Sequence, residues 1–338
     1  MTVHVGLVGG GNISETHARA ASAIPGVQVV AAYGTNAAKV GRLADACGAR
    51  PYSDLEAFLQ HSPLTMVAVG SPSGLHAVHG IAAARRGLHV LTEKPIDIST
   101  ENADKLIAAT RESGVKLGVM FQDRFKPDIR QFKRWIDSGA IGTPLLVDAR
   151  VKWYRPPEYY SGSKWRGTHA LDGGGALINQ AIHTLDLLLW LFGDVTRVQA
   201  NVATKLHAIE GEDTATALLH FSSGAVGTLV ASTAVFPGYP RRIEATGSNG
   251  TLVLEHDRIV SADLKNTFPE LTLSASSKDN ENVASPVVRD FSGHQAVFED
   301  FIQAIKENRE PGCNGMEGRR SIALVEEIYR SAKNNGTR

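Results

Sequence analysis

Asn179 and His183 form one candidate for proton-transfer chemistry. They are four positions apart in an apolar segment that predicts a helix over residues 176–192, so both side chains should lie on one helix face. A histidine imidazole accepts a proton near neutral pH, and the nearby Asp186 could orient the ring. A buried histidine bonded to Asp186 is the alternative interpretation. No metal site is predicted, because the helix lacks a third ligand beside the histidine and the aspartate.

Lys94 is a second candidate, in the segment Leu91-Thr92-Glu93-Lys94-Pro95 at the end of a predicted strand. A proline at the next position disfavours the α region for the lysine and keeps it extended. The ammonium would then lie at the edge where the strand ends, and a positive charge there could stabilise a developing alkoxide. The alternative is an exposed Glu–Lys pair before a helix.

Residues 152–167 concentrate aromatic and basic side chains, with two of the four tryptophans and three of the seven tyrosines of the chain. Flat aromatic rings suit stacking against sugars or bases, and arginine binds phosphate or carboxylate through paired hydrogen bonds. A structural loop in which arginine stacks on tryptophan, or a subunit contact, would show the same composition. The candidate ligand-binding residues are Arg155, Tyr159, Lys164, Trp165 and Arg166.

Three consecutive glycines at 9–11 predict a dinucleotide site, because an apolar run at 3–8 precedes them and a helical pattern follows. Gly9 permits a tight turn, and Gly11 lets backbone amides approach a pyrophosphate. The start of the helix adds unpaired N–H groups. Ser14 stands where the usual pattern has a third small residue, glycine or alanine, so a tight turn without a ligand also fits.

The elements that must position these residues alternate between strand and helix in the first third of the chain. Apolar strands are expected at 3–8, 27–33, 66–70, 89–92 and 115–119, with helices at 14–23, 37–46, 75–86 and 103–113. Such alternation predicts a parallel sheet covered on both faces, with ligands outside the carboxyl ends of its strands.

The pattern changes after about residue 122. Strands are expected at 145–152, 197–204, 215–221, 225–233, 242–247 and 250–255, and helices at 127–138, 176–192, 295–308 and 318–332. Sequential strands with short polar turns predict an antiparallel or mixed sheet. Residues 265–289 are rich in Ser, Asn and Asp and predict a long surface loop. We therefore expect two α/β domains, residues 1–122 and residues 123–338.

Composition limits the function classes. The 338 residues carry a formal net charge of zero, which argues against nucleic acid or an anionic membrane as the main partner. Two distant cysteines indicate neither a disulfide framework nor a zinc site. The chain enters a strand at once, without an apolar leader, and no run is long enough to span a bilayer. A cytoplasmic location is expected.

Together these motifs resemble the glucose–fructose oxidoreductase / inositol dehydrogenase / MocA family, over nearly the whole chain. The resemblance depends on Gly9-Gly10-Gly11-Asn12-Ile13, Ser71-Pro72-Ser73 with His76, Gly87-Leu88-His89-Val90, Glu93-Lys94-Pro95, and Asn179 with His183 and Asp186. It implies an N-terminal Rossmann domain with a parallel sheet. It also implies a C-terminal α/β domain whose large open sheet joins homodimers or homotetramers.

The resemblance also implies roles for single residues. Gly9, Gly11, Asn12 and Ile13 would hold the pyrophosphate of NAD(P), Ser71, Pro72 and His76 would border its nicotinamide half, and Glu93 and Lys94 would lie beside the nicotinamide. Lys94 would also touch the substrate, and His183 would be the acid/base. The common family pattern has aspartate four residues before this histidine. Asn179 cannot take a proton and would instead bind a substrate hydroxyl.

The choice between NAD and NADP stays open. The second strand ends at Tyr33-Gly34-Thr35-Asn36 and lacks the acid that usually meets the ribose of NAD. Thr35 or Asn36 could bond a free ribose hydroxyl. Alternatively, Lys39 or Arg42 could supply positive charge to a 2′-phosphate.

Within the family, the segments 153–155, 159–160, 164–168, 172–174 and 179–180 look similar to enzymes that oxidise the 3-hydroxyl of UDP-N-acetylglucosaminuronate. Asp172 thereby joins the expected substrate-binding residues. We expect hydride transfer between NAD(P) and a secondary hydroxyl of a sugar or nucleotide sugar; an unactivated sugar, a sugar acid or inositol also fits. An NAD-dependent glycosidase and a non-catalytic protein that binds cofactor or sugar are the alternatives.

Overall fold

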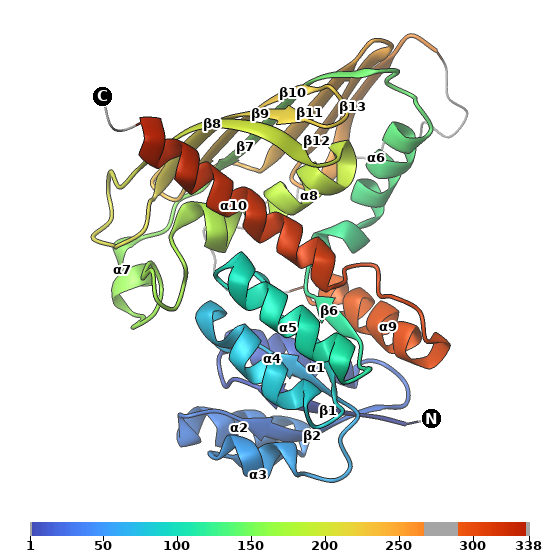
Figure 1. Cartoon of the computed structure of the whole chain (residues 1–338), viewed down its shortest axis with the longest axis vertical. Helices are drawn as coiled ribbons and strands as arrows, with labels where there is room; N and C mark the ends of the chain where they lie inside the picture. The colour runs from blue at the N-terminus through green and yellow to red at the C-terminus, as the bar shows by residue number, and fades with distance from the viewer. Residues whose placement is uncertain (1, 267–289, 336–338) are drawn as a thin grey trace. The chain divides into compact units, whose positions relative to one another are not determined.

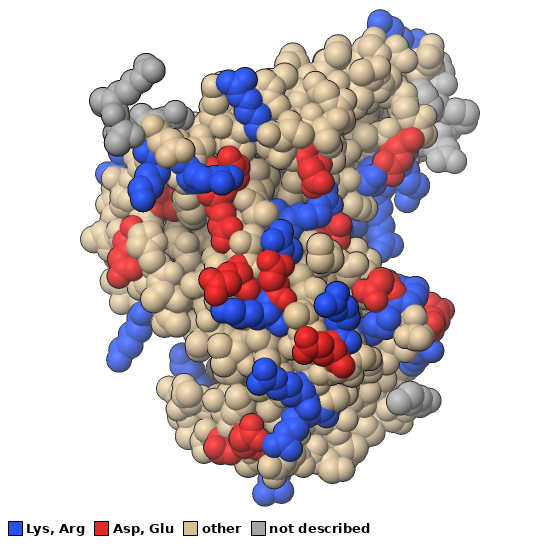
Figure 2. Space-filling model, viewed as in Figure 1, with Lys and Arg blue, Asp and Glu red and all other residues tan. Residues whose placement is uncertain are grey.

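The computed structural model describes residues 2–266 and 290–335, in two compact units (Figure 1). The first unit comprises residues 2–122 and 290–322, and the second comprises residues 123–266 and 323–335. Most of the loop predicted at 265–289 lies outside the described residues. On the face shown in Figure 2, basic and acidic side chains are interspersed, in keeping with the net charge of zero.

The first unit contains a six-stranded sheet in the order β3-β2-β1-β4-β5-β6. Every pair in it is parallel. The strands are β1 (Val3–Val8), β2 (Val27–Tyr33), β3 (Arg50–Tyr52), β4 (Met66–Val69), β5 (His89–Thr92) and β6 (Leu117–Val119). This strand order is that of a doubly wound Rossmann sheet, whose direction of winding reverses between β1 and β4. The predicted parallel sheet is confirmed.

Helices cover this sheet because its central strands are apolar on both faces; β4, for example, is buried throughout. They are α1 (Asn12–Ser22), α2 (Ala37–Cys47), α3 (Leu55–Leu59), η1 (Ser73–Leu75), α4 (His76–Ala84), α5 (Thr100–Glu112) and α9 (Ser292–Glu307). Asn36, Asp54 and Ser99 cap α2, α3 and α5 with side-chain oxygens. Although α9 is distant in sequence, it packs against α1.

The second unit is built on a seven-stranded mixed sheet in the order β13-β12-β11-β7-β10-β9-β8. Only the central β7–β10 pair is parallel among its pairs. The strands are β7 (Pro144–Lys152), β8 (Val195–Ala203), β9 (Thr214–Phe221), β10 (Val226–Ser232), β11 (Arg242–Gly247), β12 (Gly250–Glu255) and β13 (Arg258–Leu264). The predicted large open mixed sheet is confirmed.

Helices of the second unit lie along one face of this sheet (Figure 1). The helical elements are η2 (Gln122–Phe125), α6 (Pro127–Asp137), α7 (Pro157–Ser161), the π-helix η3 (Ala176–Ala181), α8 (Ile182–Phe192) and the C-terminal part of α10 (Gly315–Asn335). The opposite face exposes apolar side chains that include Leu146, Leu218 and Val226. The helix predicted at 176–192 is present, but its first six residues form a π turn and the remainder is α-helical.

Candidate active site

The glycine turn after β1 has the geometry of a phosphate-binding loop. Gly9 adopts a φ of +120°, and a Cβ there would lie 2.6 Å from the carbonyl oxygen of Gly70, so only glycine fits without strain. Gly11 precedes α1 and provides no side-chain cap, and a Cβ on it would meet nothing within 4 Å. The N–H groups of Asn12 and Ile13 therefore head a helix beside open space, which fits the pyrophosphate of a dinucleotide.

The end of β2 provides polar but uncharged groups. Thr35 and Asn36 are exposed, and the Asn36 side chain accepts a hydrogen bond from the backbone N–H of Lys39 at 3.0 Å. Asn36 is therefore also the cap of α2, a role that spacing alone did not indicate.

His76 is almost completely buried and lies between two backbone carbonyls. Its Nδ1 is 2.7 Å from the oxygen of Pro95, and its Nε2 is 2.9 Å from the oxygen of Ser71. Burial lowers the pKa of His76, although both carbonyls favour its charged form. The ring thus connects the loop after β4 to the loop after β5, while the Ser71 hydroxyl bonds His79 at 2.9 Å.

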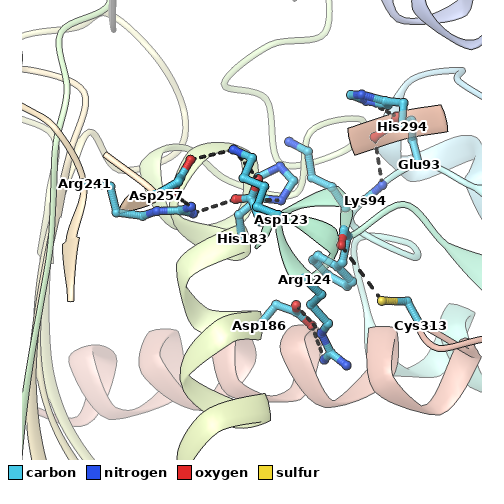
Figure 3. Close-up of polar contacts among 12 residues, drawn as sticks. Glu93, Lys94, Asp123, Arg124, His183, Asp186, Arg241, Asp257, His294 and Cys313 are labelled. Carbon is cyan, nitrogen blue, oxygen red and sulfur yellow. Dashed lines mark hydrogen bonds and ion pairs between the residues drawn. The ribbon is translucent and has the colours of Figure 1, made fainter. Parts of the chain in front are cut away.

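Glu93 anchors the lysine-bearing loop in the interior of the first unit. It is 6% exposed, and its Oε1 lies 2.9 Å from Nε2 of His17 and 3.7 Å from Nε2 of His294 (Figure 3). Its Oε2 accepts the backbone N–H of Lys94 at 3.1 Å. Burial raises the pKa of Glu93, but His17, His294 and Lys94 together lower it to about 2. The carboxylate therefore fixes the backbone that carries the Lys94 side chain.

His183 lies in the first turn of α8, beside a carboxylate that sequence spacing did not indicate. Its Nδ1 is 3.9 Å from Oδ2 of Asp123, which comes from η2 (Figure 3). Arg241 donates to the same Asp123 oxygen at 2.7 Å, and Lys126 lies 3.0 Å from the other. Burial raises the pKa of Asp123, but the charges of Arg241, Lys126 and His183 hold it well below its usual range.

Asp186, the partner suggested for His183 by spacing, binds an arginine. Arg124 donates from Nε and Nη2 to the two Asp186 oxygens at 2.7 and 2.6 Å, and both side chains are buried (Figure 3). The Arg124 guanidinium also lies 5.4 Å from the ring centroid of Trp190. This bidentate pair joins η2 to α8.

Asn179 belongs to a hydrogen-bonded chain that begins at Asp172. Its Nδ2 donates to Oδ1 of Asp172 at 2.7 Å, and its Oδ1 accepts from Nε2 of Gln180 at 3.0 Å. Gln180 also donates to the Tyr159 hydroxyl at 2.9 Å and accepts from Arg155 at 3.0 Å. The sequence resemblance included Gln180 in the segment 179–180 but gave it no role in the site. Because η3 is a π turn, α-helical spacing does not set the faces of Asn179 and His183.

The aromatic and basic side chains of the segment 153–166 stack on one another. Arg166 lies 4.1 Å from the ring centroid of Tyr159 and 5.8 Å from that of Trp165. Arg155 is buried and lies 5.4 Å from the rings of Trp153 and Tyr159. Burial lowers the pKa of Arg155. The internal arginine stack considered as an alternative is thus present, while Lys164 is exposed.

Each unit therefore gathers part of the predicted site. The first contains the glycine turn, the end of β2, residues 71–76 and the pair Glu93–Lys94. The second contains His183 and the hydrogen-bonded chain that joins Arg155, Gln180, Asn179 and Asp172. Among the described residues, no cluster of three or more His, Cys, Asp or Glu could hold a metal ion. In the same part of the chain, no helix is long and apolar enough to cross a bilayer.

Family models match both units. Residues 3–121 match the oxidoreductase family with an NAD-binding Rossmann fold, and residues 129–253 match the GFO/IDH/MocA C-terminal domain. The chain belongs to the GFO/IDH/MocA family of NAD-binding oxidoreductases, as the sequence motifs predicted.

Two relatives and one solved structure show the range of similarity. D-apiose dehydrogenase from Paraburkholderia graminis is 29% identical over 98% of this chain and 88% of its own length. Inositol 2-dehydrogenase from Rhizobium meliloti is 27% identical over 98% of this chain and 97% of its own. The WlbA dehydrogenase from Bordetella pertussis, solved with NADH and UDP-GlcNAcA, is 32% identical with a TM-score of 0.89. That likeness covers 99% of this chain and 98% of that chain.

Proposed function

We propose that this protein is an NAD-dependent dehydrogenase that oxidises the 3-hydroxyl of UDP-N-acetylglucosaminuronate or a closely related UDP-hexuronate. The observation that carries the proposal is the likeness to the WlbA dehydrogenase, which extends over 99% of this chain at 32% identity. The arginine–aromatic network supports it further, since arginine suits the diphosphate and carboxylate of such a substrate and aromatic rings suit its sugar or base.

In this proposal the first unit binds the cofactor. Gly9, Gly11, Asn12 and Ile13 hold the pyrophosphate, Thr35 and Asn36 meet the adenosine ribose, and Ser71, Pro72, His76, Glu93 and Lys94 border the nicotinamide half. NAD, when bound, supplies the hydride acceptor. The absence of an acid after β2 leaves a role for NADP, so both cofactors belong in the test.

The second unit would bind the sugar and move the proton. His183 accepts the proton of the reacting hydroxyl, and Asn179 donates to a substrate hydroxyl. Lys94, which belongs to the first unit, is assigned the role of stabilising the developing alkoxide. The rest of the substrate is assigned to Arg155, Tyr159, Lys164, Trp165, Arg166 and Asp172.

A substrate panel tests the proposal. The purified protein is incubated with NAD or NADP and one of several alcohols, and formation of the reduced nicotinamide is followed by absorbance. UDP-N-acetylglucosaminuronate should give the highest kcat/KM, and UDP-N-acetylglucosamine, which lacks only the uronate carboxylate, should be at least tenfold poorer because arginine loses its paired acceptor. A higher kcat/KM with myo-inositol, D-apiose or levoglucosan would reject the nucleotide sugar as substrate.

We also propose that the uncovered face of the second sheet joins two copies of the chain into a homodimer or homotetramer. Leu146, Leu218 and Val226 are 60%, 44% and 37% exposed on neighbouring strands. Val226 pairs in register with Leu146 on β7, and β9 lies on the other side of β10. A contiguous exposed apolar patch is typical of a protein interface. A cytoplasmic location remains a prediction from the sequence.

A further inference from the structure

Two carboxylates and two cations form a partly buried charge cluster beside the candidate base, with Asp123 and Arg241 buried and Lys126 and Asp257 partly exposed. Asp123 contacts Arg241 at 2.7 Å and Lys126 at 3.0 Å, and Lys126 contacts Asp257 at 2.5 Å. Arg241 also pairs with Asp257 (Figure 3). Asp123 and Arg241 are each 6% exposed. Such groups are costly to bury unless each is paired, so the cluster holds its members in place.

The members of the cluster come from elements far apart in sequence. Asp123 lies in η2, Lys126 precedes α6, Arg241 precedes β11, and Asp257 lies in the turn between β12 and β13. Arg241 and Asp123 are 118 positions apart. The cluster thus ties η2 and the start of α6 to the edge of the second sheet. Asp123 is the member whose carboxylate also lies beside His183.

We propose that Asp123 is the positioning residue of His183, and that it provides from η2 the negative charge that Asn179 cannot provide from the helix. The inference rests on the proposed role of His183 as the base. When the imidazole accepts a proton it becomes a cation, and a fixed carboxylate 3.9 Å from Nδ1 stabilises that cation. Asn179 is neutral and is bound to Asp172.

Other charged groups also lie on the helix of His183 and in the cluster. Asp186, on the same helix, is neutralised by the bidentate pair with Arg124. Arg241 and Lys126 oppose the effect of Asp123, and Asp257 offsets them in part. Replacing one member of the cluster should therefore change the proton affinity of His183 by an amount and sign set by that member's charge and distance.

The experiment compares Asp123→Asn with Asp257→Asn, measured as the pH profile of kcat/KM with the substrate that the panel identifies. Both changes remove one negative charge from the same cluster, and asparagine suits the left-handed backbone of Asp257, whose φ is 61°. In D123N, the acidic limb should move to lower pH by about one unit, because the protonated imidazolium of His183 is no longer stabilised by a nearby anion. The pH-independent plateau of kcat/KM should fall about tenfold or more in D123N. D257N should change the plateau and the position of the acidic limb much less.

Two further measurements keep the inference open to rejection. Arg241→Gln removes a positive charge, so the acidic limb should move to higher pH, opposite to its shift in D123N. If the variants acted only by loosening the cluster, the two shifts would have no reason to differ in direction. NMR titration of the His183 ring, assigned with a His183→Asn variant, reports the same shifts without turnover. If the wild type oxidised none of the sugars, the proposed function would fail while this titration still decided the role of Asp123. Equal shifts in D123N and D257N, or a wild-type profile in D123N, would overturn the inference.

Discussion

Lys94 and His183 are the two residues on which the proposed chemistry depends most. Lys94→Ala and His183→Ala should each lower kcat by roughly 10²–10⁴, because one removes the charge beside the alkoxide and the other removes the base. NAD affinity, measured by fluorescence titration, should change little. An exposed lysine outside the proposed sites, Lys306→Ala, is the control for turnover, and near wild-type kcat in either active-site variant would contradict these roles.

Glu93 yields a prediction about stability and pH. The pKa of its carboxyl falls from an ordinary value of 4.5 to about 2 in the folded chain. A lowered folded-state pKa means that the stabilisation is complete above about pH 4.5 and is lost as the pH falls toward 2.

Glu93→Gln should therefore be less stable than wild type by roughly 3 kcal/mol at pH 6, and the difference should shrink as the pH falls from 4.5. Urea denaturation between pH 6 and pH 3 measures this, with exposed Glu112→Gln as the control. A constant difference across that range would show that the carboxylate charge is not responsible.

Single residues show where sequence reasoning about the site reached its limit. Lys94, Asn179 and His183 were singled out because their chemistry and local spacing are visible in the chain. Asp123 was not, because its place depends on a pair formed across 118 positions of sequence with Arg241. The pairing of Asp186 with Arg124 was missed for a similar reason, since spacing on one helix does not reveal a partner that comes from η2.

At the scale of elements, apolar periodicity predicted the long strands and helices within a few residues. The predicted bounds of β1, β2, β5, β11 and β12 match the structure. The element β3 was missed because it is a three-residue segment, Arg-Pro-Tyr, without an apolar run. The strand β13 was missed because its alternation of buried and exposed residues is irregular. Sequence order also does not reveal that α9 packs against α1 in the first unit.

The π turn η3 is the element that carries Asn179, and its start requires glycine. A Cβ on Gly175 would overlap the backbone carbonyl of Glu212, while the Glu212 carboxylate accepts the N–H groups of Gly175 and Leu177 at 3.2 and 2.7 Å. Gly175→Ala should therefore destabilise the protein by about 1–3 kcal/mol and lower kcat, because backbone cannot yield as a side-chain end can.

The matched control for that change is Gly41→Ala, inside α2, where a Cβ would meet nothing within 4 Å. It should instead stabilise the protein by about 0.5–1 kcal/mol through helix propensity. Thermal denaturation of the two variants side by side measures both effects. Equal stability of Gly175→Ala and wild type would mean that η3 does not depend on the close approach to Glu212.

At the scale of the whole molecule, the sequence predicted the types of the two sheets but not which helices cover the second sheet. The alternation of elements in the first third, followed by consecutive strands, was enough to predict one parallel and one mixed sheet. In β7, the alternation of buried Val147, Ala149 and Val151 with polar residues indicates which face is covered, but it does not reveal that η3, α6 and α8 pack there.

The uncovered face makes the proposed assembly testable. Leu146→Lys places a charge on a residue that is 60% exposed in the single chain, beside Val226 on the next strand. If this face joins two copies, the lysine must be desolvated there, and the dissociation constant should rise about tenfold or more without loss of thermal stability of the single chain. Light scattering coupled to size-exclusion chromatography over a range of concentrations measures the change. Leu206→Lys is the matched control, because Leu206 is 55% exposed and lies outside the strands of the sheet. A dissociation constant equally affected by both variants, or by neither, would exclude this face as the interface.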